Sequence, residues 1–162
     1  MRTIPNARFW TRYDEVVIND LHGAVAARLK GVGQRYTTGR EVLIRALAEA
    51  PRPLTAAELV AAEPRLSQST TYRNLALLEQ AGVVRTVTGT DEYTRFELAE
   101  ELTGRHHHHL VCLSCGTVED FDAPRRVEQG LADAIARLSS GTGFRAEGHR
   151  LDVLGTCAAC AG

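Results

Sequence analysis

Residues 67–98 read SQSTTYRNLALLEQAGVVRTVTGTDEYTRFEL, and this stretch decides how the first part of the chain folds. Ser67 or Ser69 can accept hydrogen bonds from the free amide groups that open a helix. Gly82 suits the left-handed position that often follows the last helical turn. We therefore expect a helix over residues 69–81.

A β-hairpin is predicted directly after this helix. Two short runs rich in β-branched and aromatic residues, 83–87 and 93–98, flank the turn sequence TGTD at 88–91. Helices followed by a hairpin are typical of a winged-helix domain, in which the helix at 69–81, supported by one at 55–63, would enter the major groove of DNA. A small helical domain that merely contains a hairpin is the alternative that the pattern leaves open.

Three helices are predicted before this stretch. In the first, over about 16–29, apolar residues recur at every fourth position. The sequences TGRE at 38–41 and TAAE at 55–58 both match the capping box, in which a hydroxyl and a carboxylate satisfy the amide groups that open a helix. We expect the second helix to run from 38 to about 50 and the third from 55 to about 63.

The chain changes character after a polar stretch, 99–105. Strands are predicted at 109–113, 117–121 and 148–154, and Pro124 opens a helix that would turn four apolar residues inward. Those four are Val127, Leu131, Ile135 and Leu138. The pattern indicates a second, small α/β domain with a hinge within 99–105.

The length of 162 residues allows one ordinary domain or two small ones, and 44% hydrophobic with 24% charged residues predicts a folded chain. No apolar run approaches the roughly 18 residues that span a bilayer, and the N-terminus lacks the apolar core of a signal peptide. We therefore expect a cytoplasmic protein without a membrane partner. Up to Arg95 there are 13 Arg/Lys against 10 Asp/Glu, and beyond it 6 against 10, so the mildly basic first part suits a nucleic-acid partner.

Four cysteines form two CxxC pairs with 41 residues between them: Cys112, Cys115, Cys157 and Cys160. In a reducing cytosol such pairs are metal ligands more often than disulfides. Two tight turns with two thiolates each supply the closed tetrahedral site typical of structural Zn²⁺. The zinc would join the first hairpin of the second domain to its C-terminal tail. The alternatives are a redox pair or cysteines buried as small apolar residues.

Four consecutive histidines, 106–109, lead straight into the first CxxC pair. In an extended chain, successive side chains point to opposite faces, so this run can serve two metal sites with two imidazoles each. An inserted tag or a solvated loop is the alternative. Carboxylates and a further histidine elsewhere complete two ligand sets. They are His106, His108, Glu128 and His149 in the second domain, and Glu97, His107, His109 and Asp120 at the hinge.

Four ordered motifs resemble the ferric uptake regulator family of bacterial metal-responsive repressors. They are STTYRNL followed by GVV, RFEL, HHHHLVCLSCG and HRLDVLGTC, and the resemblance covers roughly residues 20–162. It implies an α+β fold in which an N-terminal winged-helix DNA-binding domain precedes a small α/β dimerisation domain, here with a three-stranded sheet. The expected boundaries are 1–16 for an N-terminal extension, 17–98 for the winged helix, 99–105 for the hinge and 106–162 for the metal-binding dimerisation domain.

The resemblance also assigns the ligands. The four cysteines match the structural zinc site, and the set with His149 matches a second site in the dimerisation domain. At the hinge, Glu97, His107 and His109 match the iron-responsive members, but the histidine that those proteins take from the DNA-binding domain falls on Pro53. The same Pro53 disfavours the peroxide-sensing members, whose oxidisable histidine would lie there.

The zinc-uptake members use a different hinge set. Their aspartate and cysteine ligands fall on Arg85 and about Ala99 of this chain, so neither template is complete. The residues that could fill the vacant position are Glu100, Glu101, His22 and Asp120.

For DNA, the resemblance assigns Tyr72 and Arg73 to the recognition helix and Arg35 to a contact in the minor groove. Arginine can donate twice to guanine or enter a narrow A/T-rich minor groove, and a tyrosine ring can contact a thymine methyl group. Phosphate contacts are expected from side chains with donor groups. They are Thr70, Thr71 and Arg40.

We therefore expect a homodimeric transcriptional repressor, not an enzyme, which binds palindromic operator DNA with metal as co-repressor. Regulation of zinc uptake is favoured because HHHHLVC and GTC are similar to the zinc-uptake members, and Glu97 supports iron as the alternative. The cofactors would be structural Zn²⁺ and regulatory Zn²⁺ or Fe²⁺. A zinc-storage or metal-transfer protein is a further alternative. A zinc hydrolase is disfavoured because the chain has no HExxH segment, and no small organic substrate is expected.

Overall fold

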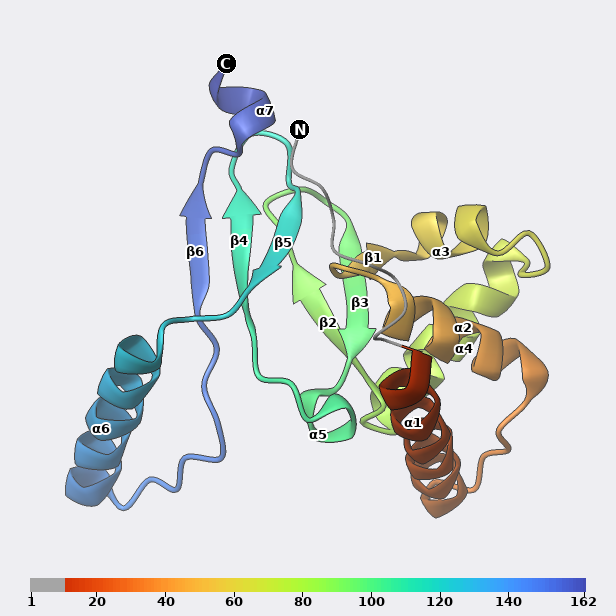
Figure 1. Ribbon diagram of the computed structural model, residues 1–162, viewed down its shortest axis with the longest axis horizontal. Coiled ribbons are helices and arrows are strands. Elements are labelled where there is room, and N and C mark those ends of the chain that lie inside the picture. The colour runs from red at the N-terminus through yellow and green to blue at the C-terminus, as the bar shows by residue number, and fades with distance from the viewer. Residues whose placement is uncertain (1–10) are drawn as a thin grey trace.

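The structure, a computed structural model, describes the backbone of residues 11–162 and the side chains from Leu21 onward. It contains two three-stranded sheets. The N-terminal helices cover the first, and α6 lies beyond the lower end of the second in the view of Figure 1. The helices are α1 (Thr11–Gly31), α2 (Thr38–Glu49), α3 (Ala56–Ala62), α4 (Gln68–Gln80), α5 (Glu100–Thr103), α6 (Arg125–Thr142) and α7 (Ala158–Ala161). The strands are β1 (Leu54–Thr55), β2 (Val84–Thr88), β3 (Thr94–Leu98), β4 (His108–Cys112), β5 (Val118–Phe121) and β6 (Asp152–Gly155).

The first half of the chain, up to β3, has one continuous core. Val25, Leu43, Leu59 and Leu75, one from each of the helices α1 to α4, have no exposed surface. The sheet has the order β1-β3-β2 with antiparallel neighbours, and the two-residue β1 was not expected from the sequence. The predicted helices followed by a hairpin are therefore present.

Helix α1 begins at Thr11, about five residues before the expected start. Its predicted apolar stripe is confirmed at Leu21, Val25 and Leu29, which are buried. The side chain of Val17 and most of the predicted extension, residues 1–10, lie outside the described residues.

Only one of the two predicted capping boxes forms. Thr55 Oγ1 accepts from the Glu58 amide at 3.2 Å, and Glu58 Oε2 accepts from the Thr55 amide at 2.7 Å. The box predicted at Thr38 is wrong, because the N-cap of α2 is Thr37, and its side chain makes no capping bond. With the cap one residue earlier, Glu41 lies one position too far along the helix to close the box.

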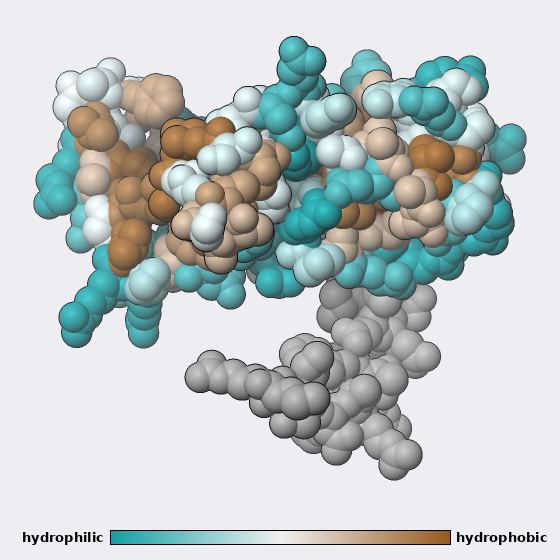
Figure 2. Space-filling model, turned by 90° about the horizontal axis from the view of Figure 1, so that it is seen from above, coloured by the Kyte–Doolittle hydropathy of each residue, from teal (hydrophilic) through white to brown (hydrophobic). Residues whose placement is uncertain are grey.

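The second half has a different organisation. Its sheet has the order β5-β4-β6, with β5 antiparallel and β6 parallel to the central β4. The expectation that α6 turns apolar residues inward is not met within this chain, since α6 has no buried residue. Val127 is 42% and Leu138 69% exposed, because no other element in the described part of the chain covers that face. Figure 2 shows hydrophobic surface at this end of the molecule, which carries β6 and α7.

The link between the halves is the short helix α5, which lies within the predicted hinge and ends at Gly104 with a φ of 65°. The halves also share a small apolar cluster of Val87, Val111 and Val118. No helix in the described residues is both long and apolar enough to cross a membrane.

The difference in helix capping between Thr55 and Thr38 can be tested by substitution. Thr55→Ala should lower the free energy of unfolding by about 1 kcal/mol, because it leaves an amide group of α3 without its acceptor. Thr38→Ala, at an exposed position that makes no capping bond, should change it by less than about 0.5 kcal/mol. Urea unfolding of both variants checks this, and equal losses would contradict the assignment of the caps.

Candidate metal centres and DNA-facing helix

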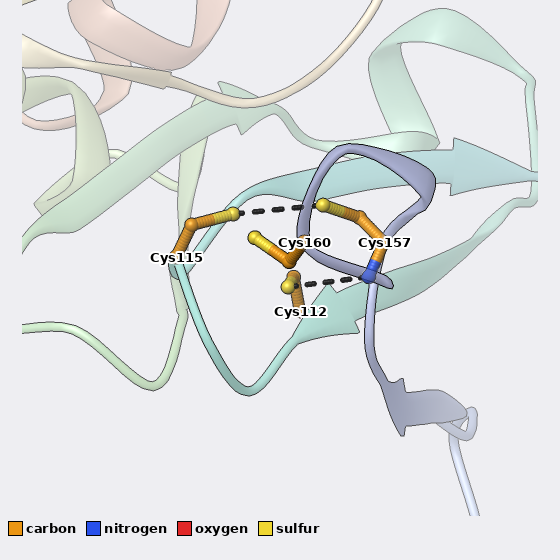
Figure 3. Close-up of side chains that lie close together, drawn as sticks. All are labelled: Cys112, Cys115, Cys157 and Cys160. Atoms are coloured by element: carbon orange, nitrogen blue, oxygen red, sulfur yellow. Dashed lines mark hydrogen bonds between the residues drawn. The ribbon is translucent and has the colours of Figure 1, made fainter. Parts of the chain in front are cut away.

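The four cysteine sulfur atoms lie at one end of the second sheet, within 4.8 Å of one another (Figure 3). Cys112 ends β4 and Cys115 lies in the turn that follows, while Cys157 caps α7 and Cys160 lies within it. The Sγ atoms of Cys115 and Cys157 are 3.7 Å apart. Two thiolates bound about 2.3 Å from one tetrahedral zinc would be about 3.8 Å apart.

Within this cysteine cluster, the surroundings of Cys112 favour a thiolate. The backbone amide of Cys157 donates to Cys112 Sγ at 3.3 Å, and this bond is the largest influence lowering the pKa of Cys112 to about 6. A thiolate is the form that binds metal. The donor set and its spacing therefore fit a closed tetrahedral zinc site.

The tip of the β2–β3 hairpin rests against the cysteine turn. The Thr90 hydroxyl donates to the Cys112 carbonyl at 2.9 Å. Gly116, with a φ of 71°, lies so close to Asp91 that a Cβ atom would come within 2.3 Å of Asp91 Oδ2. Only glycine allows this approach, which joins the two halves at a further point.

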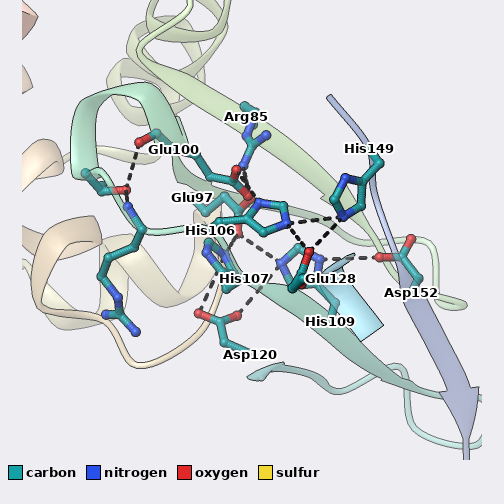
Figure 4. A network of polar contacts seen from close by, with 12 residues as sticks. Arg85, Glu97, Glu100, His106, His107, His109, Asp120, Glu128, His149 and Asp152 are labelled. Carbon is teal, nitrogen blue, oxygen red and sulfur yellow. Dashed lines mark hydrogen bonds and ion pairs between the residues drawn. The ribbon is translucent and has the colours of Figure 1, made fainter. Parts of the chain in front are cut away.

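The hinge site consists of Glu97 from β3, His107, His109 from β4 and Asp120 from β5 (Figure 4). Glu97 Oε2 is 3.0 Å from the Nε2 atoms of both histidines. The Asp120 oxygens lie 3.8 Å from the same two nitrogens. The structure thus brings together all four residues predicted for this set, and the pairing of His109 with Asp120 across β4 and β5 explains the approach.

Charge is concentrated and poorly solvated at the hinge site. Burial opposes the ionisation of Glu97, but hydrogen bonds from His107 and His109 outweigh it and lower the pKa of Glu97 to about 2. The bond to Glu97 raises the pKa of His107, and burial raises the pKa of Asp120. Within the described residues, the buried Asp120 Oδ1 has no hydrogen-bond partner. A bound cation would satisfy that oxygen, so the residues fit a metal ion.

The His149 site is the second histidine set, His106, His108, Glu128 and His149. His108 Nε2 lies 2.6 Å from Glu128 Oε1, and His149 Nε2 lies 3.4 Å from Glu128 Oε2. His106 Nε2 and His149 Nε2 face each other at 3.3 Å. Two facing imidazole nitrogens need a proton or a metal ion between them, so this set also fits a cation.

Among the candidates for the vacant hinge position, the structure brings Asp120 to the site. His22 instead forms a hydrogen bond with Tyr36, Glu100 bonds to His106, and Glu101 is exposed. A pocket of about 510 Å³ opens beside the site, and Pro53 is part of its lining.

Asp152 is a contact that the sequence analysis missed. Its Oδ1 lies 3.4 Å from Nδ1 of His109, on the side of the ring opposite Glu97. A carboxylate at this position orients a ligating imidazole. The parallel pairing that sets His109 beside Asp152 joins segments 43 residues apart, which local pattern does not indicate.

The predicted DNA-facing residues differ in their placement. Tyr72 is 51% exposed on α4, beside the exposed Arg73, and Arg35 is exposed before α2. Thr70 is half-buried, and its Oγ1 accepts from the Ser67 hydroxyl at 2.8 Å. Ser67, rather than Ser69, caps α4.

Two predicted phosphate contacts are engaged within the protein. Thr71 is fully buried and its hydroxyl donates to the Ser67 carbonyl at 3.0 Å, so it does not face a ligand. Arg40 donates to Asn74 Oδ1 at 3.2 Å and to the Arg35 carbonyl, which ties the start of α2 to α4. The sequence pattern placed both residues near DNA without showing these internal partners.

Comparison with known proteins gives a consistent assignment. Residues 31–154 match the ferric uptake regulator family. The peroxide-responsive repressor PerR of Staphylococcus aureus (strain USA300) is 30% identical over 151 residues, which cover 90% of this chain and 95% of that protein.

Solved structures agree with this match. The ferric uptake regulator Fur of Helicobacter pylori gives a TM-score of 0.71 at 20% identity, covering 90% of this chain and 94% of that one. The Vibrio cholerae regulator Fur gives 0.63 at 28% identity, covering 80% and 96%. The predicted α+β fold, with a winged-helix half and a second half built on a three-stranded sheet, is confirmed. The chain belongs to the ferric uptake regulator family.

Proposed function

We propose that this protein is a metal-dependent transcriptional repressor that binds palindromic operator DNA as a homodimer. The observation that carries the proposal is the meeting of Glu97, from the winged-helix half, with His107 and His109 from the second half. A cation bound there holds the two halves in one arrangement. Because it binds that arrangement more tightly than one in which its ligands are apart, filling the site shifts the population toward it.

The proposal keeps the domain division that we expect from the sequence. In this proposal, residues 17–98 form the DNA-binding domain, 99–105 the hinge and 106–162 the metal-binding dimerisation domain. Tyr72 and Arg73 on α4 would contact bases in the major groove. Arg35 would enter the minor groove, and Thr70 would contact phosphate.

Zinc is the sensed metal that we favour, and ferrous iron is the alternative. Two imidazoles and two carboxylates suit a tetrahedral Zn²⁺, while imidazole with carboxylate also suits iron. The S. aureus relative is a peroxide-responsive repressor, which supports repression as the activity. Pro53 carries no oxidisable side chain, which argues against the same peroxide chemistry in this chain.

Operator binding tests the proposal directly. The purified protein, titrated separately with Zn²⁺ and Fe²⁺ under reducing, anaerobic conditions, should bind its operator at least tenfold more tightly with one of the two metals than without. Arg73→Ala should weaken that binding by about tenfold or more, since a bidentate contact to guanine contributes roughly 1–3 kcal/mol.

Arg137→Ala is the matched control, because Arg137 is an exposed arginine on α6, in the other half. Metal content should be the same in both variants. Metal-independent DNA binding would refute metal as co-repressor, and normal operator affinity in Arg73→Ala would refute the placement of the recognition helix.

We also propose that the four cysteines hold a structural zinc ion. Cys115→Ser should remove one zinc per chain that otherwise survives a mild chelator, and it should make the second half unfold at a lower urea concentration. Ser114→Ala, at the exposed neighbouring position, should retain the zinc. Zinc analysis after dialysis checks both, and full zinc retention in Cys115→Ser would exclude this set.

A second copy of the chain is the proposed cover for the apolar face of α6. Leu138→Glu should convert the dimer to a monomer in analytical ultracentrifugation, because it places a charge in an apolar interface. Val32→Glu, at a residue 47% exposed just after α1, should leave the dimer intact. A stable dimer in Leu138→Glu would place the interface elsewhere.

A further inference from the structure

Arg85, on β2, lies beside Glu97 and Glu100, at the edge of the network that holds the two histidine sites (Figure 4). Its Nη2 atom is 2.9 Å from Glu100 Oε1 and 3.4 Å from Glu97 Oε1. Each of these carboxylates uses its other oxygen on histidine. Glu97 Oε2 contacts the hinge histidines, and Glu100 Oε2 lies 2.9 Å from His106 Nδ1. One guanidinium group therefore bridges carboxylates that serve both sites.

The contact with Glu100 determines which ring nitrogen of His106 carries the lone pair. When Nδ1 donates to Glu100, the lone pair of the neutral ring is on Nε2. That atom faces the His149 site, 3.3 Å from His149 Nε2 and 3.5 Å from Glu128 Oε2. A carboxylate that accepts from the distal nitrogen orients a ligating ring and raises its basicity.

These contacts cross between the halves of the molecule. All four residues of the His149 site come from the second half, whereas Arg85 belongs to the first sheet and Glu100 to α5 in the hinge. The support of His106 is therefore complete only while the halves keep this arrangement. Arg85 and Glu97 face each other in the β2–β3 register, so the orientation of the guanidinium is set by the hairpin.

We propose that Arg85 and Glu100 are positioning residues that make the His149 site regulatory, with a metal affinity that depends on the arrangement of the two halves. The inference rests on the proposed function, since it takes both sites to bind metal. Because linkage between binding equilibria is reciprocal, metal in the His149 site also favours the arrangement that completes the hinge site.

Zinc affinity of the His149 site tests the proposal without DNA. The full chain, with its cysteine zinc in place and the hinge site impaired by His107→Ala, is titrated with Zn²⁺ against a chromophoric chelator. Arg85→Met and Glu100→Gln should each weaken binding by about tenfold, the lower end of the effect of such supporting partners. Arg85→Lys should recover part of the loss because it keeps the charge.

Arg52→Met is the matched control. The side chains of Arg52 and Arg85 are each 35% exposed, and Arg52 pairs with Glu58 at 2.6 Å, away from the His149 site. Its zinc affinity should stay within twofold of the background. Equal affinities in Arg85→Met and Arg52→Met would overturn the proposal.

The tautomer of His106 separates positioning from general destabilisation. In the background protein before zinc is added to the His149 site, nitrogen NMR at neutral pH should show Nδ1 of His106 protonated. Glu100→Gln should reduce that preference. An unchanged tautomer in Glu100→Gln would refute the role of Glu100. Neither measurement needs operator DNA. A chain that fails to bind DNA would refute the proposed function, whereas this inference would still be decided by the zinc affinities and the tautomer of His106.

Discussion

One carboxylate oxygen, Glu97 Oε2, is the point on which the arrangement of the two halves depends. It lies on β3 of the first sheet and contacts two imidazoles of the second half at 3.0 Å each. Glu97 is only 8% exposed, so its charge is stable there only while those partners remain. Other contacts between the halves include a three-valine cluster, the hairpin tip at the cysteine turn, and the contacts of Glu100 with Arg85 and His106. A cation at this oxygen would strengthen an arrangement that hydrogen bonds alone already define.

The distribution of the core explains where the metal ligands lie. The first half buries side chains from four helices against its sheet. In the second half, α6 has no buried residue and every residue of β6 is exposed. A domain of this size with little core needs a bound metal, a partner or both to be stable. The cysteine cluster, the His149 site and the apolar face of α6 all lie in this half. Metal binding and assembly can therefore affect its structure directly.

The local sequence pattern was enough to predict much of the candidate site, but it did not predict the rest. Alternation along an extended segment places His106 and His108 apart from His107 and His109, and the structure has the same grouping. The capping box at Thr38 was wrong because the pattern does not show which threonine begins the helix. An apolar helix face does not show whether its own chain or another covers it, as α6 illustrates. The contact of Asp152 with His109 depends on a parallel strand pairing, and such distant pairings leave no local signal.

The hinge site differs from the ligand sets of the family at Pro53 and Arg85. Both differences change the charge of the site. Pro53 removes a neutral imidazole, and Asp120 adds a carboxylate at 3.8 Å from both histidines, which makes the ligand set more negative. Arg85, 3.4 Å from Glu97, supplies positive charge against the same set. An entering divalent ion must then compete with a guanidinium for Glu97, but that guanidinium keeps Glu100 at 2.9 Å as a partner. Such competition would lower the metal affinity of the hinge site, and Arg85 would keep Glu100 as its partner. A sensor must release its metal when the metal is scarce. A guanidinium group held beside the metal ligands therefore suits the proposed role.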